Sequence, residues 1–269
     1  RIWDYSADIK GDGEELQATR INPYLVDAPD ALLEKRSLAL SAPTELSKGS
    51  EATDFGYLFI ESQVELNAIC ASEPALKKYI RRVYGGDELL NNLERWCFWL
   101  VGANPSEVKQ SAELQRRLSA VRAERLKSAK TRTQEWAAQP GLFSENRQPQ
   151  QNYIAIPKVS SERRSYLPIA YLKETDIATG SLLTIDTASV YVFGILQSTM
   201  HMAWMRAVAG RLESRYQYSA SIVYNNYPWP QNPSDKHRAA IEAAAQAVLD
   251  ARARFPDATL ADLYDPLAM

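Results

Sequence analysis

The stretch VYVFGILQSTMHMAWMRAV, residues 190–208, decides the fold that we expect for this chain. It is apolar on nearly every side, and a helix with this pattern is typically buried at the centre of a protein. It falls short of the roughly 20 consecutive apolar residues of a membrane span, and no other apolar run comes closer. The sequence therefore predicts one central helix that other elements surround.

Short strands are expected on both sides of this helix. Apolar runs bounded by turn-forming residues indicate strands at 56–60, 96–100, 153–156, 166–171, 181–185, 211–218 and 221–224. One helical pattern begins at 61, and a second begins at Pro74 and carries Arg81 and Arg82 before a stop at Gly85-Gly86. Two more cover 104–130 and 233–255. Because strands and helices mix without strict alternation, we predict an α+β fold with a mixed or antiparallel sheet. Pro228-Trp229-Pro230 ends this region, which divides the chain into residues 1–230 and a helical C-terminal extension, 231–269.

The charge of the chain is unevenly distributed. The formal net charge is −2, yet residues 109–132 contain eight cations and two acids, a local charge of +6. Such a concentration of positive charge points to a polyanionic partner more strongly than the total does. Leu114, Leu118 and Val121 form an apolar stripe along the predicted helix, so we expect its cations to face outward. The candidates for phosphate contacts on this helix are Arg116, Arg117, Arg122, Arg125 and Lys127.

Two segments imitate the catalytic turn of amino-methyltransferases, in which Asn/Asp-Pro-Pro-aromatic residues hold a flipped base. Asn22-Pro23-Tyr24 lacks the second proline, and Asn226-Tyr227-Pro228-Trp229 has tyrosine in place of the first. No glycine-rich turn follows a strand to hold S-adenosylmethionine. We therefore interpret both segments as structural turns and predict no catalytic residue and no cofactor in this chain.

A nuclease site has weak support. Asp87, Glu107 and Lys109 fit the loose Asp…Glu-x-Lys spacing that holds Mg²⁺. That chemistry needs Glu and Lys on one face of a strand, whereas these two occupy the first turn of a predicted helix, where Glu is favoured by the helix dipole. We attribute the spacing to chance.

Histidines and cysteines give no metal pattern. His201 lies within the central helix without a second ligand at a suitable spacing, which favours a hydrogen-bonded core histidine. His237 is expected to be solvated. Cys70 and Cys97 fit no redox or metal motif, which is typical of buried thiols in a reducing compartment. We expect no metal site and a cytoplasmic location.

The segment RLESRYQYS, residues 211–219, contains the residue types of direct base readout. In an extended strand, Glu213, Arg215 and Gln217 share one face. Arginine recognises guanine, glutamine recognises adenine, and glutamate accepts a hydrogen bond from the cytosine amino group. The alternative is an amphipathic edge strand whose charged side chains pair with one another, and composition alone favours that alternative.

A second polar segment lies between two predicted strands. Ser160, Ser161, Arg163 and Arg164 combine hydroxyls with guanidinium groups, the donors that contact phosphates. Ordinary surface loops have the same composition.

Six segments together resemble one family. They are similar to the target-recognition domain of MmeI-like adenine methyltransferases of type IIL restriction-modification systems, and they follow in order along nearly the whole chain. The segments are RWCFWL (95–100), RQP (147–149), YIAIPKVSSERR (153–164), MHMAWMR (200–206), YNNYPWP (224–230) and LADLYDP (260–266). Strings of this length and tryptophan content are specific.

The resemblance implies a DNA target-recognition domain over residues 1–230 and a small helical spacer or cap over 231–269. It implies two partners, double-stranded DNA and an upstream methyltransferase domain of a larger bacterial protein. That protein would transfer a methyl group from S-adenosylmethionine to adenine N6, and would use Mg²⁺ if it includes a nuclease. It also implies base readout by Glu213, Arg215 and Gln217, with Ser181 completing the set.

Functions of three classes remain open at this point. The first is a DNA-specificity module without catalysis, and the second is an enzyme fragment that retains nuclease or methyltransferase activity. The third is a protein-interaction module of a phage-defence complex. Calorimetry with S-adenosylmethionine separates the first two, because only a methyltransferase fragment binds it.

Overall fold

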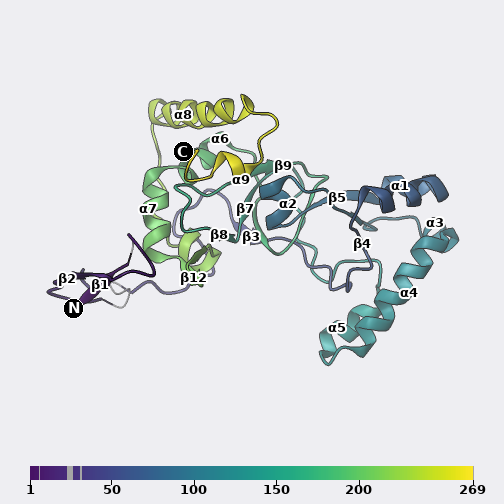
Figure 1. Cartoon of the computed structure of the whole chain (residues 1–269). Helices are drawn as coiled ribbons and strands as arrows, with labels where there is room; N and C mark the ends of the chain where they lie inside the picture. Colours follow the sequence, from purple (N-terminus) through teal and green to yellow (C-terminus); the bar gives the residue numbers. More distant parts are fainter. Residues whose placement is uncertain (6, 23–26, 31, 269) are drawn as a thin grey trace.

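The computed structural model describes residues 1–5, 7–22, 27–30 and 32–268 (Figure 1). A small N-terminal hairpin, β1 (Ile2–Asp4) and β2 (Glu14–Leu16), precedes three further sheets. Helices pack around these sheets, as expected for the α+β class that the sequence predicts. No helix in the described ranges is long and apolar enough to cross a membrane.

The first sheet has the strand order β10-β5-β6-β4. β4 (Phe59–Ile60), β6 (Trp96–Phe98) and β5 (Ile80–Tyr84) are antiparallel, and β10 (Ile177–Ala178) runs parallel to β5. α1 (Gln63–Ser72) and a 3-10 helix (Pro74–Tyr79) connect β4 to β5. Arg81 and Arg82 therefore lie in a strand, and the prediction of a helix continuing to Gly85 is wrong.

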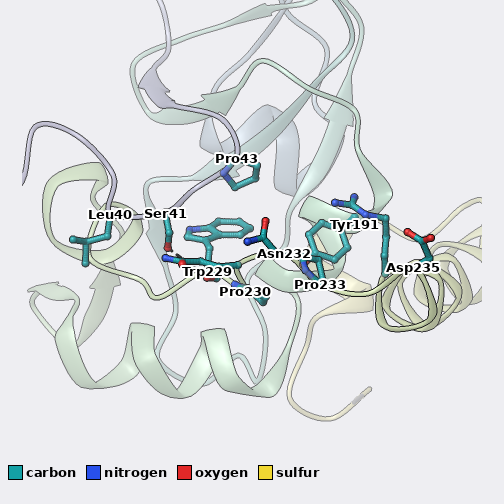
Figure 2. Close-up of a pocket in the computed structure, with 11 residues that line it drawn as sticks. Leu40, Ser41, Pro43, Tyr191, Trp229, Pro230, Asn232, Pro233 and Asp235 are labelled. Atoms are coloured by element: carbon teal, nitrogen blue, oxygen red, sulfur yellow. Dashed lines mark hydrogen bonds between the residues drawn. The ribbon is translucent and has the colours of Figure 1, made fainter.

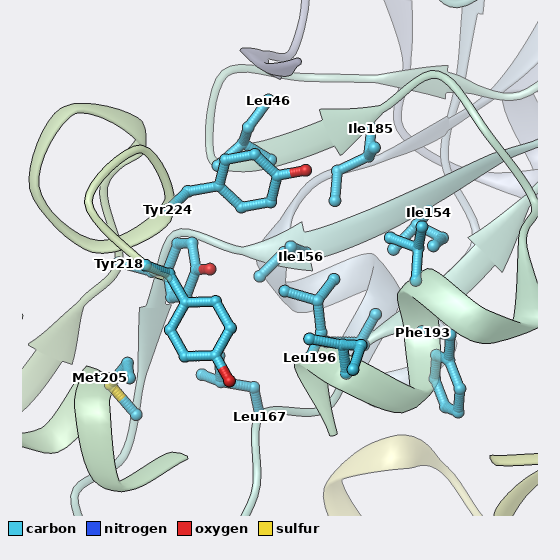
Figure 3. Packing of buried hydrophobic residues seen from close by; sticks show 14 of the residues in the cluster. Leu46, Ile154, Ile156, Leu167, Ile185, Phe193, Leu196, Met205, Tyr218 and Tyr224 are labelled. Carbon is cyan, nitrogen blue, oxygen red and sulfur yellow. The ribbon is translucent and has the colours of Figure 1, made fainter. Parts of the chain in front are cut away.

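The second sheet is antiparallel and forms the centre of the molecule. Its order is β3 (Leu46–Lys48), β11 (Leu182–Ile185), β7 (Tyr153–Pro157) and β9 (Ala170–Leu172). Ile154 and Ile156 pack toward the central helices on one face, with Phe193 and Leu196 (Figure 3). Tyr153 and Ala155 face the other way, toward α2 (Gly86–Asn91) and α9 (Leu260–Leu263). Both faces are thus covered, which is why β7 is apolar at every position.

The third sheet continues from the second. β8 (Val159–Ser160) follows β7 after the single residue Lys158. It pairs antiparallel with β13 (Arg215–Gln217), which pairs with β12 (Gly210–Leu212). The segment 153–160 therefore connects the buried core to an exposed three-stranded surface.

The central helix is divided into two. α6 (Val190–Leu196) and α7 (Thr199–Val208) are separated at Gln197 and Ser198, so the prediction of one continuous helix is wrong. The Ser198 hydroxyl accepts a hydrogen bond from the His201 backbone N–H and caps α7. Serine favours such caps because its side chain satisfies a backbone donor that the helix leaves free.

A serine also divides the cationic helix. α3 (Pro105–Gln110) ends at Ser111, whose hydroxyl caps α4 (Ala112–Lys127), and α5 (Thr131–Glu135) follows. The predicted strand at 221–224 is instead a π-helix, Ala220–Tyr224. A local and a distant contact hold its backbone. The side chain of Asn226 bonds the carbonyls of Ser221 and Ile222, and the Arg36 N–H donates to the Ser221 carbonyl at 2.9 Å.

The C-terminal helix α8 (Asp235–Ala253) packs directly on α6. The contact is close because Gly194 has no side chain there. A Cβ at this position would lie 2.9 Å from Ile241 Cγ2 and 3.0 Å from Ala245 Cβ. The helical extension is therefore docked on the central core, as Figure 1 shows.

Candidate nucleic-acid interface

A groove of about 780 Å³ lies where the third sheet meets α2 and the turn before β11. It brings together six of the residues that the sequence predicts to contact DNA, although they come from three separate segments. These residues are Ser160, Ser161, Arg164, Ser181, Arg215 and Gln217. The pairing of β13 with β8 places Gln217 beside Val159 and Tyr216 beside Ser160, which joins two of the segments.

The segment 211–218 is a hairpin and not the single strand that its alternation predicts. β12 and β13 are joined by a two-residue turn, Glu213-Ser214, with Leu212 opposite Arg215. Glu213 adopts a φ of 57°, so it lies in the turn and does not share a strand face with Arg215. Arg215 and Gln217 are two residues apart in β13 and do share one. The turn has no Asn-Gly or Gly signal, which is why the sequence pattern misses it.

Glu213 and Arg215 nevertheless form a pair at the tip of this hairpin. Arg215 Nη2 lies 2.7 Å from Glu213 Oε2, and both side chains are exposed. Arg211, on the other strand, stacks over the Tyr216 ring with its guanidinium carbon 3.8 Å from the ring centroid. The pairing that the sequence left as an alternative is thus present, and it leaves the Glu213–Arg215 pair accessible beside the groove.

Two serines of the groove differ in their hydrogen bonding. Ser181 Oγ accepts a hydrogen bond from the Gly86 N–H at 3.0 Å and lies 3.2 Å from Thr179 Oγ1, so it connects α2 to the turn before β11. Ser160 is buried, and its Oγ has no hydrogen-bond partner within the described ranges. A buried hydroxyl without a partner costs about 1–3 kcal/mol. Because this oxygen is closed to solvent, the structure does not present it to a phosphate, contrary to the expectation from the sequence.

The cations around the groove fall into two groups. Lys48 pairs with Glu51, and Arg95 pairs with Glu61 at 2.8 Å, so these two are neutralised locally. Lys158 and Arg164 line the groove and form no ion pair with any residue that the structure describes. Partial burial lowers the pKa of Arg164, although the group stays charged at neutral pH because arginine titrates far above it. These two cations are the ones available to an anionic ligand.

Lys158 is the groove cation without an ion pair among the described residues that sequence reasoning missed. It lies between β7 and β8, where the chain passes from the core to the exposed sheet. The sequence does contain a signal for Lys158. A lysine directly after the apolar run at 153–157 marks the point at which the chain leaves the core. Arg163 is exposed and is not part of the groove lining.

Arg117 of α4 is buried, so the expectation that it faces outward toward phosphates is wrong. Its Nη1 donates to the backbone oxygens of Tyr57 and Phe59 at 2.9 and 2.8 Å. Its Nε and Nη2 bond Glu113 at 2.6 Å and Glu65 at 2.5 Å. These contacts tie α4 to the first sheet.

Arg125 of α4 is also misassigned by the sequence, since its side chain is fully buried. All five of its N–H donors bond backbone carbonyls at 2.8–2.9 Å. The acceptors are Ala52, Thr53, Trp136, Gln139 and Leu142. A sequence signal exists, because Arg125 continues the helical stripe of Leu114, Leu118 and Val121.

The remaining α4 candidates are exposed. Arg116 pairs with Glu113 at 2.7 Å and Lys127 pairs with Glu124 at 2.6 Å, while Arg122 forms no ion pair within the described chain. α4 lies at one side of the molecule, away from β8 and β12 (Figure 1). The cationic helix and the groove are therefore separate surfaces.

The segment Asn225-Asn226 holds a distant part of the chain. Asn226 Nδ2 donates to the Glu34 carbonyl at 3.1 Å, and its Oδ1 accepts from Arg36 Nε at 2.9 Å. Asn225 Nδ2 donates to the Arg36 carbonyl. The interpretation of this segment as a structural turn agrees with these contacts. Pro23 and Tyr24 of the other methyltransferase-like segment lie outside the described residues.

Glu107 is held by neighbours on another element. Lys78 Nζ lies 2.6 Å from Glu107 Oε2, the Tyr79 hydroxyl donates to the same oxygen at 2.6 Å, and these bonds lower the pKa of Glu107. Asp87 lies elsewhere, at the groove. Within the described ranges, no group of three or more His, Cys, Asp or Glu side chains is placed to hold a metal ion.

His201 is buried, as predicted, and its Nε2 lies 2.9 Å from the Tyr218 hydroxyl. Burial lowers the pKa of His201 to about 4. An unfolded chain takes up this proton near pH 6.5, so the unfolded state binds more protons than the folded state between these values. The contribution of His201 to the free energy of unfolding is therefore complete above pH 6.5, and it is lost as the pH falls from 6.5 to about 4.

We therefore expect the free energy of unfolding to fall by about 2 kcal/mol between pH 7 and pH 5 through His201 alone. His201→Gln retains a polar partner for Tyr218 but does not titrate. Urea unfolding of both proteins at the two pH values isolates this contribution. Equal losses in the two proteins would show that His201 is protonated, or exposed, in the folded state.

Comparison with known proteins shows the family of the chain. The sequence model of the MmeI target recognition domain matches residues 27–231, most of the chain. The chain belongs to the MmeI target recognition domain family. The model of the MmeI C-terminal domain matches residues 233–269.

Two relatives show the extent of the match. DNA methyltransferase A of Bacillus subtilis strain 168 is 34% identical over 251 residues, 93% of this chain and 28% of that protein. The solved structure of the type IIL restriction-modification enzyme MmeI in complex with DNA is 42% identical, with a TM-score of 0.93. That match covers 96% of this chain and 34% of the MmeI chain. This chain thus spans about a third of these relatives.

A second hollow, of about 730 Å³, lies where the two matched MmeI segments meet (Figure 2). Pro43, Trp229 and Pro233 line it, and Arg238 of α8 stacks over the Tyr191 ring of α6 at 4.3 Å from the centroid. Side-chain contacts therefore join the C-terminal segment to the rest of the chain, in addition to the covalent connection.

Proposed function

We propose that this chain reads the DNA sequence for a larger adenine-specific DNA methyltransferase of a restriction-modification system. The observation that carries the proposal is the groove, in which Arg215, Gln217 and Ser181 lie beside the unpaired cations Lys158 and Arg164. Membership of the MmeI family supports it, as does the solved MmeI complex, which contains DNA. Base-reading side chains and phosphate-binding cations together are what sequence-specific recognition requires.

The roles within the groove follow from chemistry. Glu213 and Arg215 read one base pair, with glutamate accepting from a cytosine amino group and arginine donating to guanine O6 and N7. Gln217 is suited to adenine, and Ser181 completes the set. Lys158 and Arg164, with the hydroxyl of Ser161 and the neighbouring Arg163, hold phosphates and fix the register of the duplex.

Catalysis is assigned to the rest of the larger protein. In this proposal residues 1–230 form the recognition domain, residues 231–269 form its helical cap, and neither binds S-adenosylmethionine or a metal. The upstream portion transfers the methyl group to adenine N6 in the cytoplasm, with Mg²⁺ only if it includes a nuclease. The relatives are about three times as long as this chain, which leaves room for such a portion.

Arg164→Gln tests the phosphate contacts of the groove. We expect this change in the full-length protein to weaken binding to all duplexes alike and to reduce the slope of log K against log salt by about one. The matched control is Arg254→Gln, which removes one exposed cation near the end of α8 and should leave the slope unchanged. An unchanged slope for Arg164→Gln would place the phosphates elsewhere.

The same titration decides the role of α4. Arg122 is its exposed cation without an ion pair among the described residues, so Arg122→Gln reports most directly on a phosphate contact at this helix. A slope reduced by about one would extend the interface to α4.

A further inference from the structure

The N-terminal hairpin β1–β2 is a separate two-stranded sheet that projects from the rest of the molecule (Figure 1). Ile2, Trp3 and Asp4 pair with Leu16, Glu15 and Glu14. The ion pair of Arg1 with Glu15, at 2.9 Å, and the hydrogen bond from Gly11 N–H to Asp8 O lie within the hairpin itself.

Apolar side chains of this hairpin are uncovered. The exposed fractions are 51% for Trp3, 47% for Tyr5 and 43% for Leu16. Five of the six strand residues are exposed, whereas β7 is buried at every position. A two-stranded hairpin is marginally stable in water by itself, and it needs a third strand or a packed face for stability. These exposed side chains leave the hairpin with a face that a partner could cover.

The charge of the hairpin indicates the class of partner. Residues 1–16 contain five acids and two basic side chains, a net charge of −3. A DNA backbone would repel this surface. A protein partner is consistent with both the acidic charge and the exposed aromatic side chains, since Trp and Tyr are enriched in protein–protein interfaces.

The matched families narrow the partner further. The first of the two MmeI family matches begins at residue 27 and the second at residue 233, so the hairpin precedes both. In the solved MmeI structure most of the chain lies outside the match to this one. We infer that hairpin β1–β2 docks on the methyltransferase portion of the same polypeptide, through Trp3, Tyr5 and Leu16 and the free strand edges. This inference rests on the proposed function, because it assumes that such a portion exists.

Hydrogen exchange without DNA tests the inference. Peptides covering residues 1–16 are expected to exchange about tenfold or more slowly in the full-length protein than in the 269-residue chain, because docking protects their amides. Trp3→Lys combined with Leu16→Lys should remove this protection in the full-length protein. The matched control is Val64→Lys on α1, which is 80% exposed, and it should leave the protection intact.

Two results would overturn the inference. One is equal exchange of these peptides in the two proteins. The other is protection in the 269-residue chain that increases with its concentration, which would assign a second copy as the partner. Neither result depends on DNA recognition, so a failure here is distinguishable from a failure of the groove experiments.

Discussion

Arg125→Met is expected to lower the free energy of unfolding by about 3–5 kcal/mol, because it removes the buried guanidinium group that donates to five backbone carbonyls. The guanidinium group joins α4 to the segments at 52–53 and 136–142 through five backbone carbonyls. Methionine fills much of the volume but donates nothing, so the carbonyls lose their donors in a site closed to water. Urea unfolding at pH 7 measures the loss.

Arg122→Met is the matched control, three residues earlier on the exposed face of the same helix. We expect a change within about 0.5 kcal/mol for this surface position. Arg125→Lys should also be destabilising, since one ammonium group has three donors and cannot reach five carbonyls. A loss below about 1 kcal/mol for Arg125→Met would mean that water replaces the guanidinium group and that the network is not structural.

Exchanging the charges at the tip of hairpin β12–β13 is expected to change the DNA sequence that is methylated. Each single change, Glu213→Lys or Arg215→Asp, should reduce recognition by about 10- to 100-fold, because one wrong contact costs about 1–3 kcal/mol. The double change restores a pair of opposite polarity across the 2.7 Å contact. We expect it to favour the reversed orientation of one base pair.

The measurement is to place the double variant in the full-length protein and to map methylated sites across a genome by sequencing. Arg211→Ala is the control, because Arg211 stacks on Tyr216 and is not part of the groove lining. It should retain the original recognition sequence. A motif that stays the same in the double variant, or changes at every position together, would show that Glu213 and Arg215 do not read bases.

Much of the fold follows from local pattern, and the exceptions have physical causes. The apolar run at 153–156 predicts β7, and the run at 181–185 predicts β11, because continuous burial needs continuous apolar sequence. The central helix is interrupted where Ser198 caps α7, since a serine hydroxyl competes for backbone donors. The π-helix at Ala220–Tyr224 is bonded by a distant segment, since the Arg36 N–H donates to its Ser221 carbonyl.

The candidate site was predictable in its residue types but not in its geometry. Arg215, Gln217 and Ser181 were assigned from sequence, and the structure places all three at one groove. The alternation at 211–218 suggested a single extended strand, because a turn at Glu213 without glycine gives no local signal. Lys158 was missed because its role depends on β8 turning toward β13.

The sequence by itself determined the family, the α+β class and the segments that meet at the groove, because apolar periodicity and long specific strings are properties of neighbouring residues. Only the tertiary structure decided which groups each arginine bonds. Arg117, Arg122 and Arg125 are chemically identical on α4, yet two are buried and one is exposed. A guanidinium group has five donors, and whether they bond carbonyls of the same chain or an external phosphate depends on which segments pack around it.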